Sequence, residues 1–236
     1  MSTEHDAPVE HEHADVTGGW LRPAVFGAMD GLVSNFALLA GVAGGGASRH
    51  VIILAGLAGL SAGAFSMAAG EYTSVASQAE NAQAEIAKER AELLQNPDGE
   101  LAELAATFVD RGVEPDLARE VARQIHADPD VAVEVHARDE LGVTMNDLPS
   151  PLLAAVSSFV SFAVGAIIPV LPFLLGANAL LPVVIVSLLG LFGCGAIVTR
   201  LTARPWWFGG LRQLILGAVA AGLTYFIGNL VGAGLA

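Results

Sequence analysis

The chain has 236 residues, of which 53% are hydrophobic and only 15% are charged, whereas a soluble domain carries about 25% charged residues. The net charge is nevertheless −13, and so acidic a chain lacks the surplus of Lys and Arg that binds phosphates, which argues against a nucleic acid partner. The single cysteine, Cys194, excludes an intrachain disulfide.

The acidic residues are concentrated in two parts of the chain. Residues 1–20 hold five of them and residues 80–147 hold seventeen, which leaves only Asp30 and Glu71 elsewhere. An uneven distribution of this kind separates water-facing sequence from apolar sequence. We therefore expect four parts: a disordered cytoplasmic tail with acidic residues and histidines at 1–20, transmembrane sequence at 21–79, a cytoplasmic helical domain at 80–148, and transmembrane sequence at 149–236.

Two apolar segments follow the tail, at about 22–46 and 50–75. Each exceeds the ~20 residues that an α-helix needs to cross ~30 Å of hydrocarbon, and a segment in lipid must satisfy its own backbone hydrogen bonds. Both segments are therefore predicted to be transmembrane helices. Residues 76–95 contain no helix breaker, so the second helix can continue into the acidic block as one long helix.

Three side chains in these two spans are candidates for an ion pathway. Ionisable groups inside a span are costly and point to function, and Asp30 lies about eight residues, or ~12 Å, past Arg22. Met67 and Glu71 are four residues apart and share a helix face, at a depth similar to that of Asp30 in antiparallel spans. Carboxylates with a thioether suit a transition metal better than Ca²⁺ or Mg²⁺. The alternative is an aspartate paired near the bilayer edge and a methionine that only fills space.

The acidic block is predicted to form short helices. The sequence Asn-Pro-Asp-Gly at 96–99 is a turn signal, and Pro115 and Pro129 each follow an acidic residue, as a first helical residue does. We expect helices at about 76–95, 99–111, 115–127 and 129–142.

Carboxylates on these helices are candidate metal ligands. A cage formed by three such helix faces would resemble the inward-facing carboxylates of di-iron bundles. The alternative is a solvated acidic surface. The pairs that share a face through a spacing of three or four residues are Glu89 with Glu92, Glu100 with Glu103, and His136 with Glu140.

Three more apolar segments, at about 151–176, 179–203 and 208–234, complete the chain. Pro169 and Pro172 lie inside the first of them and are expected to kink or unwind it. Small-residue spacings such as Gly41-x-x-x-Gly45 and Gly228-x-x-x-Gly232 allow helix backbones to approach closely.

The fold class expected is all-α: a polytopic membrane protein with five transmembrane helices and a cytoplasmic helical metal-binding domain between helices 2 and 3. Lys and Arg near span ends set the orientation. Of the eleven basic residues, ten lie on the side of the N-terminus and only Arg49 lies on the other. We therefore place the N-terminus and the acidic block in the cytoplasm and the C-terminus outside.

At these motifs the chain resembles the vacuolar iron transporter family, over residues 13–234. The stretch VFGAMDGLVSNFALLAG resembles the first helix of that family, and AGLAGLSAGAFSMAAGEYTSVASQ resembles the second. The resemblance places Asp30 at a proton- and metal-linked aspartate and Met67 at a methionine that contacts the ion. It places five residues at the glutamates of the cytoplasmic metal-binding domain: Glu89, Glu92, Glu100, Glu103 and Glu140.

The resemblance implies a homodimer with its pore at the two-fold axis, which exports Fe²⁺ from the cytosol by proton antiport and is not an enzyme. It implies no prosthetic group. Fe²⁺, or else Mn²⁺, Zn²⁺ or Co²⁺, would be the transported and domain-bound ion, so the expected partners are a second copy, the lipid bilayer, metal ions and protons. Short loops, and no vacuolar targeting signal that we can identify, favour the plasma membrane of a prokaryote over a vacuolar membrane.

The chain departs from a plant-type member of that family in two respects, at three positions. Gly59 stands where the plant-type protein has a second pore carboxylate, and Glu71 would take over part of its role. His136 and Ala137 stand where it has two methionines, and a harder imidazole ligand would favour Fe²⁺, Mn²⁺, Co²⁺ and Zn²⁺ more evenly. Three other functions stay open, namely a membrane-anchored metal sensor or buffer, a di-iron-type membrane oxidase, and a channel without proton coupling.

Overall fold

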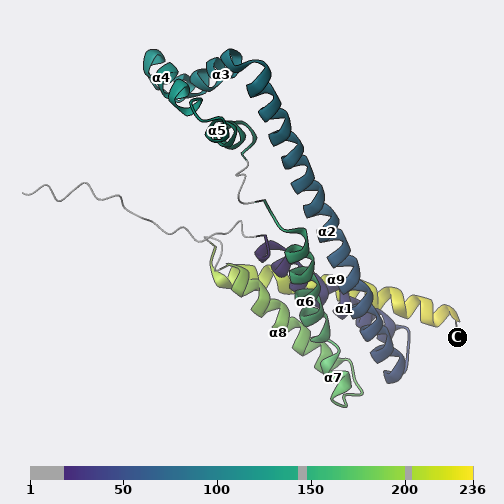
Figure 1. Cartoon of the computed structure of the whole chain (residues 1–236). Coiled ribbons are helices and arrows are strands. Elements are labelled where there is room, and N and C mark those ends of the chain that lie inside the picture. Colours follow the sequence, from purple (N-terminus) through teal and green to yellow (C-terminus); the bar gives the residue numbers. More distant parts are fainter. Residues whose placement is uncertain (1–18, 143–147, 200–203, 236) are drawn as a thin grey trace, which may run out of the picture. The chain divides into compact units, whose positions relative to one another are not determined.

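The structure is a computed structural model that describes residues 19–142, 148–199 and 204–235 (Figure 1). The described residues form helices joined by turns and contain no strand, which confirms the all-α class. Almost all of the predicted tail at 1–20 lies outside the described residues. The helices are α1 (Leu21–Gly44), α2 (Arg49–Gln95), α3 (Pro97–Asp110), α4 (Pro115–Ile125), α5 (Pro129–Leu141), α6 (Pro151–Ile167), α7 (Leu171–Leu174), α8 (Leu181–Val198) and α9 (Trp206–Leu235).

Among the described helices, α1, α2, α8 and α9 are long and apolar enough to cross a bilayer, and α6 is apolar but has only 17 residues. Large apolar side chains such as Leu54, Phe65 and Leu189 are exposed on these helices. A soluble protein would bury such side chains, whereas lipid accepts them. The helices therefore suit a membrane protein, while the count of five spans stays a prediction.

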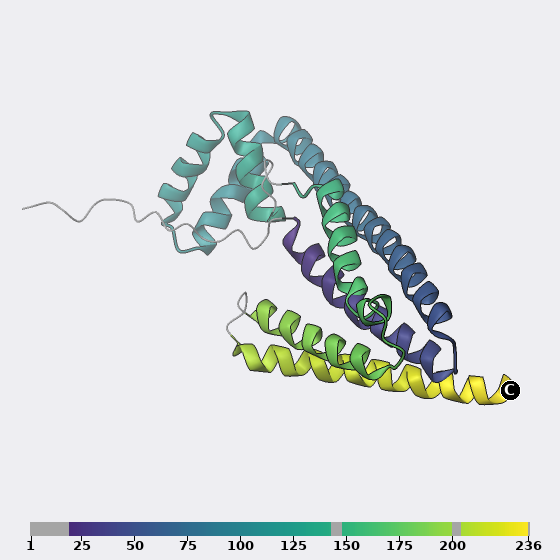
Figure 2. The same cartoon turned by 90° about the horizontal axis from the view of Figure 1, so that it is seen from below.

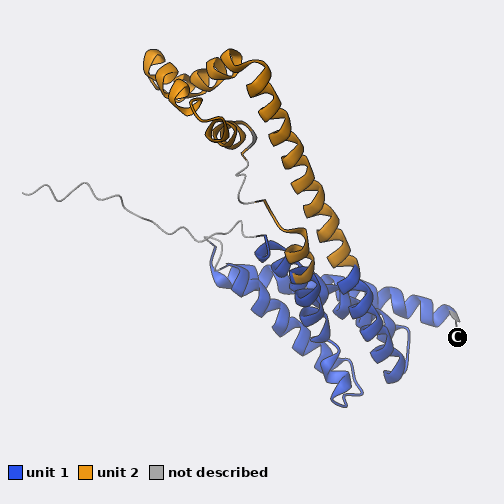
Figure 3. Cartoon of the chain, in the orientation of Figure 1, with its two compact units in different colours: residues 1–65, 157–236 blue, residues 66–156 orange. Residues whose placement is uncertain are grey.

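The chain packs as two compact units (Figure 3). Unit 1 comprises Met1–Phe65 and Ser157–Ala236, and unit 2 comprises Ser66–Val156. The boundaries fall inside α2 and α6, so both helices contribute to both units. A division by packing does not report which residues lie in a bilayer, so the predicted bounds at 79 and 148 stay predictions.

In unit 1, α9 packs along both α1 and α8, and Figure 2 shows α8 and α9 side by side. The contact of α1 with α9 uses the two small-residue spacings. A Cβ added at Gly228 would collide with the backbone carbonyl of Gly41, and one at Gly232 would lie 2.8 Å from the carbonyl oxygen of Gly45. The glycines therefore let two helix backbones meet directly.

Helix α6 ends at Ile167, and the chain turns before α7 begins at Leu171, which confirms the predicted break near Pro169 and Pro172. In a continuous helix the carbonyl of Ala166 would accept from the residue four positions later, but the N–H of Val170 donates to Ile167 instead.

Asn35 from α1 makes up for this loss. Its side-chain amide, only 2% exposed, donates to the carbonyl oxygens of Ala166 (2.6 Å) and Gly56 (3.1 Å). At the end of α7, the side chain of Arg49 donates to the carbonyl oxygen of Phe173 through Nε and Nη2. Side chains from α1 and α2 thus donate to backbone carbonyls of the broken segment.

In unit 2, α2 runs unbroken to Gln95, which confirms the predicted long helix. Helices α4 and α5 begin at Pro115 and Pro129, as predicted, and the side chains of Glu114 and Asp128 accept from backbone N–H groups of their first turns. The predicted start of the preceding helix at 99 was wrong. That helix, α3, begins at Pro97, because Asn96 caps it and proline fits a first helical turn.

Candidate metal centre

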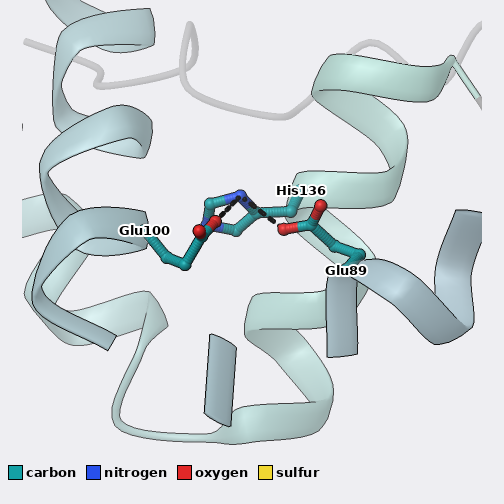
Figure 4. A group of neighbouring side chains, drawn as sticks. All are labelled: Glu89, Glu100 and His136. Carbon is teal, nitrogen blue, oxygen red and sulfur yellow. Dashed lines mark ion pairs between the residues drawn. The ribbon is translucent and has the colours of Figure 1, made fainter. Parts of the chain in front are cut away.

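His136 on α5 is fully buried in unit 2 and lies among carboxylates from three helices. Glu89 comes from α2, Glu100 from α3, and Glu140 from the next turn of α5. Figure 4 shows Glu89 and Glu100 turned toward the imidazole ring of His136. These three residues offer ligand atoms that all lie within 4.8 Å of one another. We call Glu89, Glu100, His136 and Glu140 the His136 cluster.

Two ion pairs hold α5 in place around this cluster. Arg90 on α2 contacts Asp130 at 3.0 Å, and Arg111, which follows α3, contacts Asp139 at 2.8 Å. Both pairs are partly exposed, so each contributes little stability by itself. Together they connect α5 to α2 and to the end of α3, the helices that supply Glu89 and Glu100.

Three carboxylate oxygens surround Nδ1 of His136. Oε1 of Glu140 lies at 3.0 Å, Oε1 of Glu89 at 3.1 Å and Oε2 of Glu100 at 3.9 Å. A ring nitrogen carries at most one proton, and of the three contacts only the one with Glu140 has the geometry of a hydrogen bond. Oε1 of Glu89 is therefore buried without a hydrogen bond. Such an oxygen costs free energy unless a cation or a proton satisfies it.

The carboxylates also hold protons more tightly than usual. Burial, with the charge of Glu140 adding to it, raises the pKa of Glu89 to about 7, although His136 acts in the opposite direction. Burial and the charge of Glu103 raise the pKa of Glu100. Crowded carboxylates of this kind favour whichever cation neutralises them, a proton or a metal ion. Oxygen ligands with one imidazole nitrogen suit Fe²⁺, Mn²⁺, Co²⁺ or Zn²⁺.

Two predicted ligands lie at the margin of the cluster. The carboxylate of Glu92 is 3.8 Å from Nζ of Lys88, and Glu103 is exposed. Both carboxylates still raise the pKa of Glu100 by their charge. The structure thus brings together Glu89, Glu100, His136 and Glu140 and leaves Glu92 and Glu103 beside them. That any of these six side chains binds metal stays a prediction.

The sequence analysis missed His126, which follows α4 as its C-terminal cap residue. Its Nε2 lies 3.1 Å from Nε2 of His136, and the two rings meet edge to face. Burial lowers the pKa of His126, as does the charge of His136. No spacing within one helix links the two histidines. The available signal for this contact was the short connection predicted between the helices at 115–127 and 129–142. A short connection brings the end of one helix close to the next helix.

The predicted pathway residues lie on α1 and α2. Asp30 is exposed on α1 in unit 1, and Met67 and Glu71 are partly buried on the part of α2 that belongs to unit 2. Each is described within its own unit, so their common depth stays a prediction.

The surroundings of Gly59 bear on its departure from the plant-type pattern, because a longer side chain there would have to displace the flexible end of Leu38. A Cβ at Gly59 would meet the side chain of Leu38 and lie 3.0 Å from Oδ1 of Asn35.

The family model of the VIT family matches residues 21–229. The chain is 39% identical over 229 residues to a protein named vacuolar iron transporter from Acanthamoeba castellanii, across 94% of this chain and 82% of that protein. It is 31% identical to vacuolar iron transporter 1 of Oryza sativa subsp. japonica and 28% identical to vacuolar iron transporter 1 of Arabidopsis thaliana, each across 94% of this chain and 90% of the relative.

Proposed function

This chain belongs to the VIT family, and we propose that it exports Fe²⁺ from the cytoplasm across a membrane in exchange for protons. Members of this family are transporters and not enzymes, which argues against the di-iron oxidase considered above. The relatives are named as iron transporters, which supports iron as the cargo. The observation that carries the proposal is the buried His136 cluster in a chain whose other helices suit a bilayer.

The first step is capture of the ion by the acidic block. Unit 2 presents a strongly negative surface, which raises the local concentration of divalent cations. The His136 cluster then takes the ion, with the carboxylates of Glu89, Glu100 and Glu140 replacing part of its water shell. Glu92 and Glu103 contribute their charge from the margin and join as ligands when the ion is present.

The second step is passage through the membrane helices. Asp30, Met67 and Glu71 form the path, and protonation of Asp30 from the outer side releases the ion. Asp30 and Glu71 are the only acids outside residues 1–20 and 80–147, and charged groups persist in spans where ions or protons move past them. Because Gly59 offers no carboxylate, Glu71 on α2 supplies the second carboxylate of the path, after Asp30 on α1.

The architecture that we propose is a homodimer with five spans per chain, in which α6 and α7 together form the broken third span. Exposed apolar side chains along α2, such as Val51 and Leu57, are available to pack against a second copy. The basic residues near span ends place the N-terminus and the acidic block in the cytoplasm. We place the protein in the plasma membrane of a prokaryote, although its relatives are named for the vacuole.

Metal flux into proteoliposomes tests this function. Purified protein reconstituted around a metal-sensitive dye should admit Fe²⁺ faster than protein-free vesicles, and Mn²⁺ should compete whereas Mg²⁺ should not. The Asp30→Ala variant should retain metal binding but lose flux, because the His136 cluster is intact and the path is not. Ser34→Ala, exposed one turn further along α1, is the matched control and should transport normally.

A membrane-anchored sensor or buffer gives the opposite pattern in the same assay. Such a protein would bind Fe²⁺ at the His136 cluster while vesicles containing it filled no faster than empty ones. That result would reject transport and leave the binding site standing.

A further inference from the structure

We infer that His126 is a positioning residue, whose Nε2 accepts the Nε2–H of His136 and thereby leaves Nδ1 of His136 free to bind a metal ion. This inference rests on the proposed function in one respect, namely that the His136 cluster binds a divalent metal. His126 belongs neither to the predicted ligands nor to the carboxylates around Nδ1. It lies on the other edge of the His136 ring, with 3.1 Å between the two Nε2 atoms.

The two edges of the His136 ring have different neighbours. Nδ1 faces Glu89, Glu100 and Glu140, and Nε2 faces His126. A neutral imidazole carries one proton, so a metal ion on Nδ1 requires that the proton sit on Nε2. His136 is 0% exposed, so an N–H at Nε2 needs an acceptor within the protein. Nε2 of His126 is the partner at hydrogen-bonding distance.

In the metal-free cluster, the same contact between His126 and His136 forms with donor and acceptor exchanged. Nδ1–H of His136 then donates to Glu140, and Nε2 of His136 accepts from Nε2–H of His126. On metal binding, the proton on Nδ1 of His136 leaves for solvent through Glu140. The proton on Nε2 of His126 moves to Nε2 of His136, and Nδ1 of His126 takes up a proton from water. Each ring has one proton before and after, so the exchange is balanced.

The surroundings of His126 allow this exchange. His126 is partly buried and lines a cavity of about 250 Å³ together with Arg90 and Pro129. The cavity gives its ring a route to water, while its backbone N–H, bonded to the carbonyl of Ala122, fixes it at the end of α4. The lone pairs of the two nitrogens in an imidazole point in diverging directions. An ion on Nδ1 of His136 is therefore out of reach of His126, which acts through His136 and not as a ligand. Partners of this kind orient metal-binding histidines and their loss weakens affinity about 10–100-fold.

The test uses the full-length protein in detergent micelles, labelled with ¹⁵N-histidine, with Zn²⁺ as the diamagnetic probe. The ring nitrogen shifts of His136 report which nitrogen carries the proton. We expect the proton on Nδ1 without metal and on Nε2 with Zn²⁺. A proton that stays on Nδ1 in the Zn²⁺-loaded protein would overturn the inference.

Variants separate positioning from a structural role. His126→Phe keeps the ring and removes the acceptor, and should weaken Zn²⁺ binding at His136 about 10–100-fold. His126→Gln retains an acceptor oxygen and should recover most of the affinity, and His50→Phe, on exposed sequence of α2, should match the wild type. Equal Zn²⁺ affinity of His126→Phe and wild type, with unchanged circular dichroism, would refute positioning. Should His126→Phe lose its helical signal, the His126→Gln affinity and the wild-type nitrogen shifts decide the matter.

The experiment also separates this inference from the function on which it rests. Glu89→Gln and Glu100→Gln should abolish the Zn²⁺ response of His136 whatever His126 does. If the nitrogen shifts of His136 in the wild-type protein do not respond to Zn²⁺, both metal binding at the His136 cluster and the role of His126 are rejected. A response with wild-type Zn²⁺ affinity in His126→Phe, together with no response in Glu89→Gln, would reject only the role of His126.

Discussion

At the scale of single residues, the chemistry of the cluster follows from one buried oxygen. Oε1 of Glu89 has no hydrogen bond, because the single proton of Nδ1 of His136 goes to Glu140. The carboxylate is 6% exposed, and its pKa of about 7 reflects that burial and the neighbouring negative charge. With metal binding as proposed, protons and metal ions compete for this cluster near neutral pH.

This competition predicts how stability changes with pH. The folded-state pKa of Glu89 lies above its ordinary value of 4.5, so the folded metal-free protein binds more protons than the unfolded chain between that value and about 7. The stabilising effect of the proton is complete at low pH and is lost as the pH rises through about 7. Glu89→Gln mimics the protonated acid. In a metal chelator it should unfold at a higher temperature than the wild type at pH 8, and the difference should disappear at pH 5.

Glu85→Gln is the matched control for this prediction, because Glu85 is exposed on the same helix. Its unfolding temperature should follow that of the wild type at both pH values. An equal gap between Glu89→Gln and wild type at pH 5 and pH 8 would contradict the account. Saturating metal should reverse the trend, since the ion needs the ionised carboxylate and stabilises the fold more as the pH rises.

Four members of the predicted ligand set could be found from sequence because spacing along a helix determines a shared face. Glu89, Glu100, His136 and Glu140 do meet, whereas Glu92 and Glu103 show that a shared face does not ensure a shared centre. His126 could not be found in this way. Its contact joins the end of α4 to the middle of α5, and only the packing of two helices creates it.

At the scale of elements, helix ends and helix contacts depend on a few small or polar residues. Asn35 supplies the donor for the carbonyl of Ala166, which the turn after α6 leaves free. Asn35→Leu has similar volume but no donor, so it leaves a buried carbonyl unsatisfied at a cost of about 1–3 kcal/mol. We expect a lower thermal unfolding temperature in micelles. Ser34→Ala alters the exposed neighbouring position and should leave the unfolding temperature unchanged. An equal drop in unfolding temperature in both variants would argue against the role of Asn35.

The contact between α1 and α9 yields a second prediction at this scale. A methyl group at Gly228 would collide with the carbonyl of Gly41, whereas one at Gly222, on the same helix, has nothing within 4 Å. Gly228→Ala should therefore destabilise the protein by separating two backbones, although alanine is the better helix former. Gly222→Ala should be neutral or slightly stabilising. If differential scanning fluorimetry gave the two variants the same midpoint, close packing at Gly228 would be disproved.

Most elements could be predicted because their signals are local. The prolines at 169 and 172 predicted the end of α6, and the absence of breakers predicted the length of α2. The start of α3 was misplaced because Asn96-Pro97 serves equally as a turn signal and as a cap with a first helical residue. The pairing of Gly41 with Gly228 could not be predicted, since either glycine spacing suits any helix partner.

At the scale of the whole molecule, the chain combines apolar helices with an acidic helical unit. Composition alone was enough to predict this combination, because lipid and water select opposite residues. The number of spans was not determined in the same way. With 17 residues, α6 is shorter than a typical span, and only its pairing with α7 would complete one. The second copy is proposed from exposed apolar side chains on α2. The orientation in the membrane is proposed from the positions of Lys and Arg.

Proton counterflow during iron uptake tests the central claim most directly. Proteoliposomes would hold a pH-sensitive dye, with K⁺ and valinomycin fixing the membrane potential so that passive proton movement cannot balance the charge of Fe²⁺. Coupled exchange predicts that external Fe²⁺ makes the vesicle interior more alkaline, and that Asp30→Asn abolishes both the pH change and the uptake. Iron uptake without any change in internal pH, equal in wild type and Asp30→Asn, would contradict proton-coupled transport through Asp30.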